Sequence, residues 1–232
     1  MTYEELIPAA QEYGVSISPE LQEKLKTYAK LLKEWNEKMN LTAIVEEPEV
    51  IEKHFLDSLT CATVYDFSGK SVADIGSGAG FPGIIIALAF PTSNVTLIDA
   101  TKKKFLFLEE VKKTLQIENL TFHIGRVEDM KAERESFDCV TSRGFAQMNV
   151  FLEVATPLVK MNGTVLAMKG PRGEEELFAS LNAEKKLSLH LRKKKTIVLP
   201  GGETRMNFTF EKTGRTPPRF PRPWAEIVKK PL

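Results

Sequence analysis

Hydrophobic residues near the start of the chain recur at the three- and four-residue spacing of an amphipathic helix. Over Leu21–Met39 they form one apolar face, and the preceding Ser18-Pro19 supplies an N-cap and a proline at the first helical position. No strand pattern occurs before Gly69. We therefore expect residues 1–65 to form a helical extension.

After Gly69, short β-branched runs alternate with helical stretches. Strands that alternate with helices predict an α/β fold, in which a mostly parallel sheet carries helices on both faces. The predicted strands are Ser71–Ile75, Val95–Asp99, Leu120–Ile124, Phe137–Ser142 and Thr164–Met168. The predicted helices between them are Phe81–Phe90, Lys102–Leu115 and Asn149–Lys160.

The last part of the chain changes pattern twice. A predicted helix near Glu174–Lys186 is followed by predicted strands at Leu187–Leu199 and Met206–Lys212, and Gly201-Gly202 between them is typical of a hairpin turn. The sheet should therefore end with an antiparallel pair, in a domain over residues 66–214. Residues 215–232 hold five of the 13 prolines, which predicts an extended, unpacked, basic tail.

The composition is that of an ordinary soluble globular protein, with 42% hydrophobic and 27% charged residues. The two cysteines lie far apart and form no CxxC motif, so we expect neither a disulfide nor a metal site. A reducing cytoplasm is the expected compartment. The longest apolar stretch, Phe81–Phe90, is too short to span a bilayer, so no membrane partner is expected. We also expect a monomer.

The formal net charge of +1 conceals a division along the chain. Residues 1–184 carry 19 basic and 28 acidic side chains, whereas residues 185–232 carry 13 basic and 3 acidic ones. Such an asymmetry points to a nucleic acid or another anionic surface as partner. A basic end that is merely solvated explains it equally well.

A glycine-rich loop follows the first predicted strand and precedes a predicted helix. Glycines let the backbone approach a ligand closely, and ligands of open α/β sheets bind beyond the carboxyl ends of the strands. A dinucleotide fold prefers Gly-x-Gly-x-x-Gly, and here the third glycine comes one residue early. The carboxylate before the glycines would repel a pyrophosphate but could orient S-adenosylmethionine, which has a sulfonium, an amino group and no phosphate. The loop reads Asp74-Ile75-Gly76-Ser77-Gly78-Ala79-Gly80-Phe81-Pro82-Gly83.

The second predicted strand ends in an acid, Asp99, which lies 21 residues after Gly78. A carboxylate at this point can accept hydrogen bonds from both hydroxyls of a ribose. Its alternative role is to cap the predicted helix Lys102–Leu115. Together with the loop, Asp99 favours an adenosyl cofactor, and we expect Asp74, Gly76, Gly78 and Asp99 to bind it.

A series of short motifs runs along nearly the whole chain. They are Trp35-Asn36, Asn40-Leu41-Thr42, His54–Leu59, the glycine loop with Phe81-Pro82-Gly83, Gly125–Asp129, Ser142-Arg143, Met168-Lys169-Gly170 and the proline-rich basic end. With these motifs in this order, the chain resembles class I S-adenosylmethionine-dependent methyltransferases. More narrowly, it resembles the bacterial small-subunit rRNA guanine-N7 methyltransferase family, also called glucose-inhibited division protein B. The resemblance implies a Rossmann-like fold with the cofactor held at Gly76, Phe81, Val127, Glu128 and Arg143.

The resemblance also implies methyl transfer to N7 of a guanine in 16S rRNA, within the small ribosomal subunit or an assembly intermediate. The loop Ser142–Phe145 lacks the Asn/Asp-Pro-Pro-aromatic motif of adenine amino methyltransferases, and Cys139 is typical of a buried mid-strand cysteine. Guanine N7 has a free lone pair and no proton, so direct in-line attack needs proximity and orientation rather than a base. We expect no certain catalytic residue.

Arg143 is the candidate for positioning. Its guanidinium could bind a carboxylate of the cofactor or a phosphate of the RNA. The alternative is an arginine paired with Glu128 or Asp129.

Two groups of cations are expected to bind RNA. Three lysines open a predicted helix, where cations oppose the helix macrodipole, which suggests a use in gripping phosphate. Three arginines of the tail lie among aromatic residues that can stack on unpaired bases. A solvated lysine triplet and a tail strapped across the helical extension remain alternatives. The expected RNA-binding residues are Lys102, Lys103, Lys104, Arg215, Arg219 and Arg222.

Three other functions are compatible with parts of the sequence. A methyltransferase acting on proteins or small molecules would share the cofactor loop but would not need the basic C-terminal segment. A non-catalytic RNA-binding protein of ribosome assembly would keep the basic surface but not the two acids and the glycines. A dinucleotide oxidoreductase is disfavoured by the glycine spacing.

Overall fold

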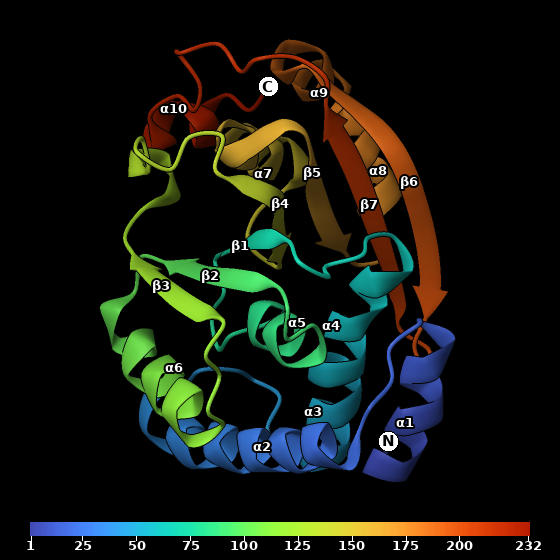
Figure 1. The fold of residues 1–232 in the computed structure, drawn as a ribbon. Coiled ribbons are helices and arrows are strands. Elements are labelled where there is room, and N and C mark those ends of the chain that lie inside the picture. Colours follow the sequence, from blue (N-terminus) through green and yellow to red (C-terminus); the bar gives the residue numbers. More distant parts are fainter.

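The computed structural model describes residues 1–232 and is built around a seven-stranded sheet (Figure 1). Its strands are β1 (Ser71–Ile75), β2 (Asn94–Asp99), β3 (Leu120–Ile124), β4 (Phe137–Arg143), β5 (Val159–Lys169), β6 (Leu189–Val198) and β7 (Thr204–Lys212). The strand order is β3-β2-β1-β4-β5-β7-β6. Neighbours among β1 to β5 run parallel, whereas β7 is antiparallel to both β5 and β6. The expected mostly parallel sheet with an antiparallel C-terminal pair is confirmed.

The helices fall before, between and after these strands. The α-helices are α1 (Tyr3–Glu12), α2 (Pro19–Met39), α3 (Glu47–Val50), α4 (Asp57–Leu59), α5 (Gly83–Ala89), α6 (Lys102–Thr114), α7 (Met148–Ala155), α8 (Gly173–Ala179), α9 (Leu181–Leu187) and α10 (Trp224–Lys229). The shorter or wider turns are a π-helix η1 (Ile51–Leu56) and the 3₁₀ turns η2 (Thr60–Thr63), η3 (Val127–Asp129) and η4 (Thr156–Leu158).

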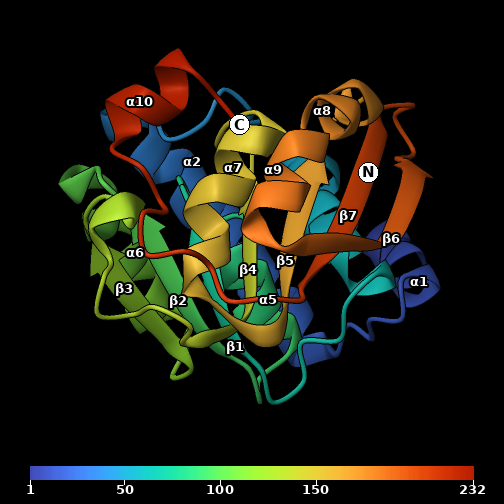
Figure 2. The same cartoon turned by 90° about the horizontal axis from the view of Figure 1, so that it is seen from above.

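Helices cover both faces of the sheet and divide the core into two layers. The N-terminal helices pack with α5 and α6 against one face, whereas α7, α9 and α10 pack against the other. The second layer lies over the strands in the view from above (Figure 2). Along β1, Val72 points into the first layer and Ala73 into the second, as alternation along a strand requires.

Side-chain caps begin the two long helices of the extension, and the sequence predicts the cap at Ser18. The Thr2 hydroxyl accepts a hydrogen bond from the Glu5 amide while the Glu5 carboxylate accepts one from the Thr2 amide, which closes a capping box. The Ser18 hydroxyl accepts from the Leu21 amide at the start of α2. α2 ends at Met39, and its C-cap residue Asn40 has a left-handed φ of 48°.

Three predicted helices differ from the expectation. The helix predicted over Phe81–Phe90 covers only Gly83–Ala89. The helix predicted over Asn149–Lys160 ends at Ala155, and β5 begins at Val159, because Pro157 has no amide hydrogen with which to continue an α-helix. The helix predicted over Glu174–Lys186 is two helices, α8 and α9, that meet at Ser180.

The prediction of an unpacked tail is wrong for much of residues 215–232. The segment lies against η4 and α7 and ends in the short helix α10, while Phe220 and Ile227 are buried. Prolines leave carbonyl groups without regular partners, and the Arg134 guanidinium donates to three of them, at Thr216, Pro217 and Phe220. The prolines therefore exclude regular structure from the first half of the tail without excluding packing.

Candidate active site

A pocket of about 380 Å³ opens at the carboxyl ends of β1 to β4. The chain passes from β1 to β2 on one side and reaches β4 on the other, so the pocket lies where the topology reverses. Open α/β sheets bind ligands at this point, and small-molecule sites commonly span ~300–1,000 Å³. The lining comprises Ile75 and Gly76 at β1, Ile98, Asp99, Ala100 and Lys104 at β2, Gly125, Arg126, Val127 and Glu128 after β3, Gly144 and Phe145 after β4, and Trp224.

The pocket brings together half of the residues predicted to hold the cofactor: Gly76, Asp99, Val127 and Glu128. Val127 is buried, and the Glu128 carboxylate lies 3.3 Å from one guanidinium nitrogen of Arg126. These residues come from three different loops that the parallel strands place at one edge. The fold therefore brings together residues that lie far apart in the sequence.

The backbone of the glycine loop requires glycine at Gly76, which lines the pocket, and at Gly78, which lies outside the lining and donates its amide to Asp99. Gly76 and Gly78 have φ values of 68° and 58°, in the left-handed region that other residues avoid. A Cβ on Gly76 would also lie 2.5 Å from a ring carbon of Phe145. The backbone of this loop consequently lies at the pocket wall, where a ligand can contact it directly.

Asp99 lines the pocket and accepts hydrogen bonds from three neighbouring groups. One carboxylate oxygen accepts from the Thr101 amide at 2.9 Å, and the other accepts from the Gly78 amide at 3.1 Å and the Lys104 ammonium at 2.9 Å. Burial alone would raise the pKa of Asp99, but the hydrogen bonds from Lys104 and Thr101 outweigh it and hold the pKa below its ordinary value. Asp99 is therefore an ionised acceptor at neutral pH.

The Asp99 carboxylate has one hydrogen-bond acceptor position left for a ligand. A carboxylate offers about four acceptor positions, and three are filled. A ligand with two hydroxyl donors would need two positions, so one of the present donors would have to leave. Lys104 is the only one of the three donors on a flexible side chain, so its ammonium is the one that such a ligand would displace.

Asp74, which we expected to contact the cofactor, lies behind the loop and outside the pocket lining. It is fully buried, and one carboxylate oxygen accepts from the Gly83 amide at 2.8 Å, at the start of α5. The other oxygen has no hydrogen-bond partner. Burial raises the pKa of Asp74 to about 7, although the Gly83 hydrogen bond opposes the rise. In the structure Asp74 supports the loop from below.

The Asp74→Asn variant should lack a pH dependence of stability that the wild type has. Between pH 3.8 and about 7 the folded protein holds a proton on Asp74 that the unfolded chain has lost, so this group's contribution to stability falls as pH rises. The fall amounts to roughly 4 kcal/mol, since one pKa unit is about 1.4 kcal/mol. Urea unfolding of both proteins between about pH 4 and pH 8 measures the difference.

The free energy of unfolding of the Asn variant minus that of the wild type should increase toward neutral pH. His54 is buried and contributes a dependence of opposite sign below its ordinary pKa, but it is common to both proteins and cancels in the difference. Two parallel curves would contradict the assignment of a protonated Asp74.

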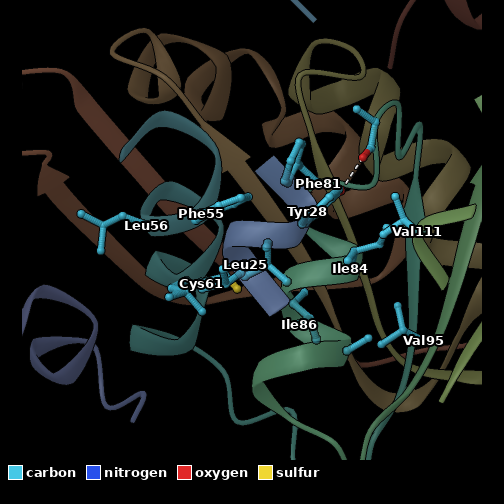
Figure 3. Close-up of a cluster of buried hydrophobic side chains, with 14 of the residues drawn as sticks. Leu25, Tyr28, Phe55, Leu56, Cys61, Phe81, Ile84, Ile86, Val95 and Val111 are labelled. Atoms are coloured by element: carbon cyan, nitrogen blue, oxygen red, sulfur yellow. Dashed lines mark hydrogen bonds between the residues drawn. The ribbon is translucent and has the colours of Figure 1, made fainter. Parts of the chain in front are cut away.

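Phe81 lies in the core beneath the loop and outside the pocket lining. Figure 3 shows it beside Tyr28 and Phe55, with its ring stacked on Tyr28 at a centroid distance of 5.2 Å. The Tyr28 hydroxyl donates to the Ala79 carbonyl, so α2 holds the loop through one side chain (Figure 3). The ring of His54 also stacks on Phe81, with 4.4 Å between the two ring centroids.

Arg143 is turned toward the helical extension. Its guanidinium donates to the Asp57 carboxylate at 3.0 Å and to the Lys53 carbonyl at 2.9 Å, and it lies 2.9 Å from Nδ1 of His54. The alternative prediction, an ion pair of Arg143 with Glu128 or Asp129, is wrong. Burial and the charge of Arg143 lower the pKa of His54 to about 3, so the imidazole is neutral.

A second arginine completes this buried junction. Arg205 of β7 donates to the same oxygen of Asp57 as Arg143 does, at 3.0 Å. Asp57 has a side chain that is only 4% exposed, so two guanidinium groups offset one desolvated carboxylate. The junction fixes η1 and α4 against the ends of β4 and β7, and it holds Phe81 beneath the glycine loop.

The predicted RNA-binding cations divide into free and engaged side chains. Lys102, Lys103, Arg215 and Arg219 are exposed and form no ion pair. Lys104 is bound to Asp99 and lines the pocket. The sixth cation, Arg222, is bound to Glu153, so its charge is already engaged within the protein.

Sequence reasoning missed several pocket residues. Phe145 and Gly144 directly follow the Ser-Arg pair, and Gly125 and Arg126 directly precede Val127, so adjacency along the chain is the feature that indicates them. Trp224 has no such indication, because 79 positions separate it from Phe145. Only the packing of the tail brings it to the pocket.

Metal and thiol chemistry find no obvious site in the molecule. No group of three or more His, Cys, Asp or Glu side chains is placed to hold a metal ion. Cys61 and Cys139 are free and buried, and burial raises the pKa of both thiols. Neither is placed or ionised as a nucleophile. No helix combines the length and the apolar character needed to cross a membrane.

Comparison with protein families and curated proteins gives a consistent result. A family model described as rRNA small subunit methyltransferase G matches residues 21–205. The chain is 40% identical over 237 residues to the ribosomal RNA small subunit methyltransferase G of Bacillus subtilis, covering 100% of this chain and 99% of the relative. The protein of that name from Mesoplasma florum is 40% identical over 218 residues, covering 94% and 92%.

Solved structures share the fold at low sequence identity. The YcgJ protein from Bacillus subtilis aligns with a TM-score of 0.54 and 15% identity over 68% of this chain and 98% of its own. TYW2 from M. jannaschii in complex with AdoMet gives 0.53 and 18% over 67% and 74%. The precorrin-6y C5,15-methyltransferase from Geobacter metallireducens gives 0.53 and 11% over 68% and 88%. At these identities the likeness concerns the class I methyltransferase fold.

Proposed function

Because the chain belongs to the family of rRNA small subunit methyltransferase G, we propose that it transfers a methyl group from S-adenosylmethionine to N7 of a guanine in 16S rRNA. The match at about 40% identity along essentially the whole chain carries this proposal. The pocket supports it, since the residues that line it offer a ribose acceptor and a glycine backbone on one wall.

The residues that line the pocket favour one orientation of the cofactor. Asp99 would accept the ribose hydroxyls, and Val127 and Glu128 beyond β3 would hold the adenine. The methionine end then lies toward Gly76 and Gly144, between β1 and β4. When bound, S-adenosylmethionine supplies a methyl group on a sulfonium sulfur. A nucleophile that attacks the methyl carbon displaces the neutral sulfide without an added acid.

The distribution of charged side chains in the pocket suits a base-free reaction. Asp99, Lys104, Arg126 and Glu128 all lie on the β2 and β3 side. The opposite wall, where the methyl group is expected, is formed by glycines, isoleucine and two aromatic rings, and carries no titratable group. Guanine N7 needs none, because its lone pair attacks in line and no proton is released. The chain's contribution is therefore to orient the base and to exclude water.

The exposed cations of α6 and of the tail are proposed to bind the RNA backbone. Lys102 and Lys103 begin α6 directly after the loop that holds Asp99. Arg215 and Arg219 lie on the part of the tail that Arg134 binds, at the amino end of β4. Each is free of ion pairs, so its charge is available to phosphate.

The test is the 7-methylguanosine content of 16S rRNA from a strain that lacks this protein. Mass spectrometry of the nucleosides should show the loss of one 7-methylguanosine, restored by the wild-type gene and not by an Asp99→Ala variant. Other modified nucleosides in the digest serve as internal controls. An unchanged profile would overturn the proposal in favour of a protein or small-molecule methyltransferase or a non-catalytic assembly factor.

A further inference from the structure

Two aromatic side chains meet at the pocket wall that lacks titratable groups. Phe145 follows β4, and Trp224 is the first residue of α10. Their ring centroids lie 5.8 Å apart and their planes are inclined by 54°. Both rings line the pocket and neither is fully buried, so part of each aromatic face is open to a ligand.

The tail holds Trp224 at this wall with unusual firmness for a proline-rich segment. Two residues earlier, the Arg222 guanidinium donates to both oxygens of Glu153 at 2.8 and 2.6 Å, and the Arg222 amide donates to the same carboxylate. Three residues later, the Ile227 side chain is fully buried against the second core layer. The indole is thus anchored from both sides along the chain.

The position of the rings relative to the cofactor residues determines what they can contact. Asp99 and the β3 loop occupy the opposite side of the pocket, so the cofactor's adenosine would lie away from the two rings. Phe145 packs directly over Gly76, at the end where the methyl group is expected. The rings therefore border the space that a methyl acceptor must enter.

We propose that Trp224, together with Phe145, forms the surface on which the target guanine stacks during methyl transfer, an inference that rests on the proposed function. An unpaired purine is held well by an aromatic face, and that contact requires no hydrogen-bond donor. In the reaction the N7 lone pair forms the bond to the methyl carbon, the carbon–sulfur bond breaks, and its electron pair stays on sulfur. The guanine thereby gains a positive charge, and an aromatic face attracts a cation.

Three substitutions at position 224 separate stacking from packing. Trp224→Phe keeps an aromatic face, Trp224→Leu keeps apolar bulk without one, and Trp224→Ala keeps neither. Methyl transfer from labelled S-adenosylmethionine to small subunits of the deletion strain gives kcat and KM, and calorimetry gives the Kd of the cofactor. The Leu and Ala variants should lower kcat/KM for the subunit by roughly 5- to 150-fold, the range for losing one base–aromatic stack, and Phe should remain near wild type.

The Kd of S-adenosylmethionine should stay close to the wild-type value in all three variants. Val228→Ala is the matched control, because Val228 is exposed on the same helix and does not line the pocket. A Leu variant as active as the Phe variant would overturn the proposal and leave Trp224 a packing residue. Cofactor binding weakened by the same factor as kcat/KM would also overturn it, since Trp224 would then belong to the cofactor site. Wild-type protein that methylates no deletion-strain subunit would instead overturn the proposed function.

Discussion

The Asp99→Ala variant should lose the rise in melting temperature that S-adenosylmethionine gives the wild-type protein. Hydrogen bonds to a charged group are worth ~1.5–3 kcal/mol each, so losing two of them to a ribose weakens binding by about a hundredfold or more. A ligand present at about 100 times its Kd stabilises a protein by ~2.7 kcal/mol, and a hundredfold weaker Kd leaves ~0.4 kcal/mol. Differential scanning fluorimetry with and without the cofactor measures both.

The comparison has to be made within each protein. Asp99 also holds the Gly78 and Thr101 amides and the Lys104 ammonium, so the variant without ligand will itself melt earlier. Lys103→Ala is the matched control, since this lysine is a near neighbour that is exposed and unpaired. Stabilisation of the wild type by NADH and not by S-adenosylmethionine would contradict the assignment of the cofactor.

The Arg222→Ala variant should release the tail from the body of the protein. The Glu153 side chain is fully buried and receives three hydrogen bonds from Arg222. Removing the arginine leaves a buried carboxylate without a counter-charge, which costs about 3–5 kcal/mol unless the structure opens. The tail can open locally, and we expect faster hydrogen exchange and tryptic cleavage within residues 215–232, together with a lower melting temperature.

Arg219→Ala provides the contrast on the same segment. Arg219 is exposed and lies over the ring of Phe220, 5.0 Å from its centroid, with no ion pair. Its loss should change stability by less than about 0.5 kcal/mol, while the salt dependence of RNA binding should fall by about one phosphate contact. Equal protection of the tail in both variants would show that the Arg222–Glu153 pair does not hold it.

Features that depend on neighbours along the chain could be predicted from the sequence. β1 and β3 have the expected bounds. β1 is a short, buried apolar run that ends before Gly76, and β3 is a partly exposed edge strand whose run ends before Gly125. Asp99 could be placed in the pocket since it ends a strand beside the glycine loop, and every such strand end lies at the same edge.

Features that depend on distant partners could not. Asp74 and Arg143 are residue types that often bind cofactors, but here both are hydrogen-bonded within the protein. Asp74 accepts from the Gly83 amide, and Arg143 donates to the Asp57 carboxylate. The partner of Arg143 lies 86 positions earlier, and no local pattern encodes it. For the same reason Trp224 could be named as an aromatic residue of a basic tail but not located at the pocket.

The fold gives a second explanation for the separation of acidic and basic residues along the sequence. Several cations of the basic C-terminal part neutralise acids of the acidic part, as Arg205 does with Asp57 and Lys212 with Glu135. Arg222 and Glu153 are a third such pair. The asymmetry along the chain is therefore partly an internal attraction between the two parts, and only the unpaired remainder is available to RNA.

The helical extension meets the C-terminal hairpin across almost the longest separations in the molecule. Glu52 accepts from the Gly201 amide, and Thr60 accepts from the Asn207 side chain, over 149 and 147 positions. Contacts of this kind reward the chain only after a large loop has closed, and such topologies fold slowly. We therefore expect the helices that begin the sequence to complete their docking only after β6 and β7 have formed. On this expectation the extension and the sheet unfold together, and the extension is not a detachable cap on an autonomous core.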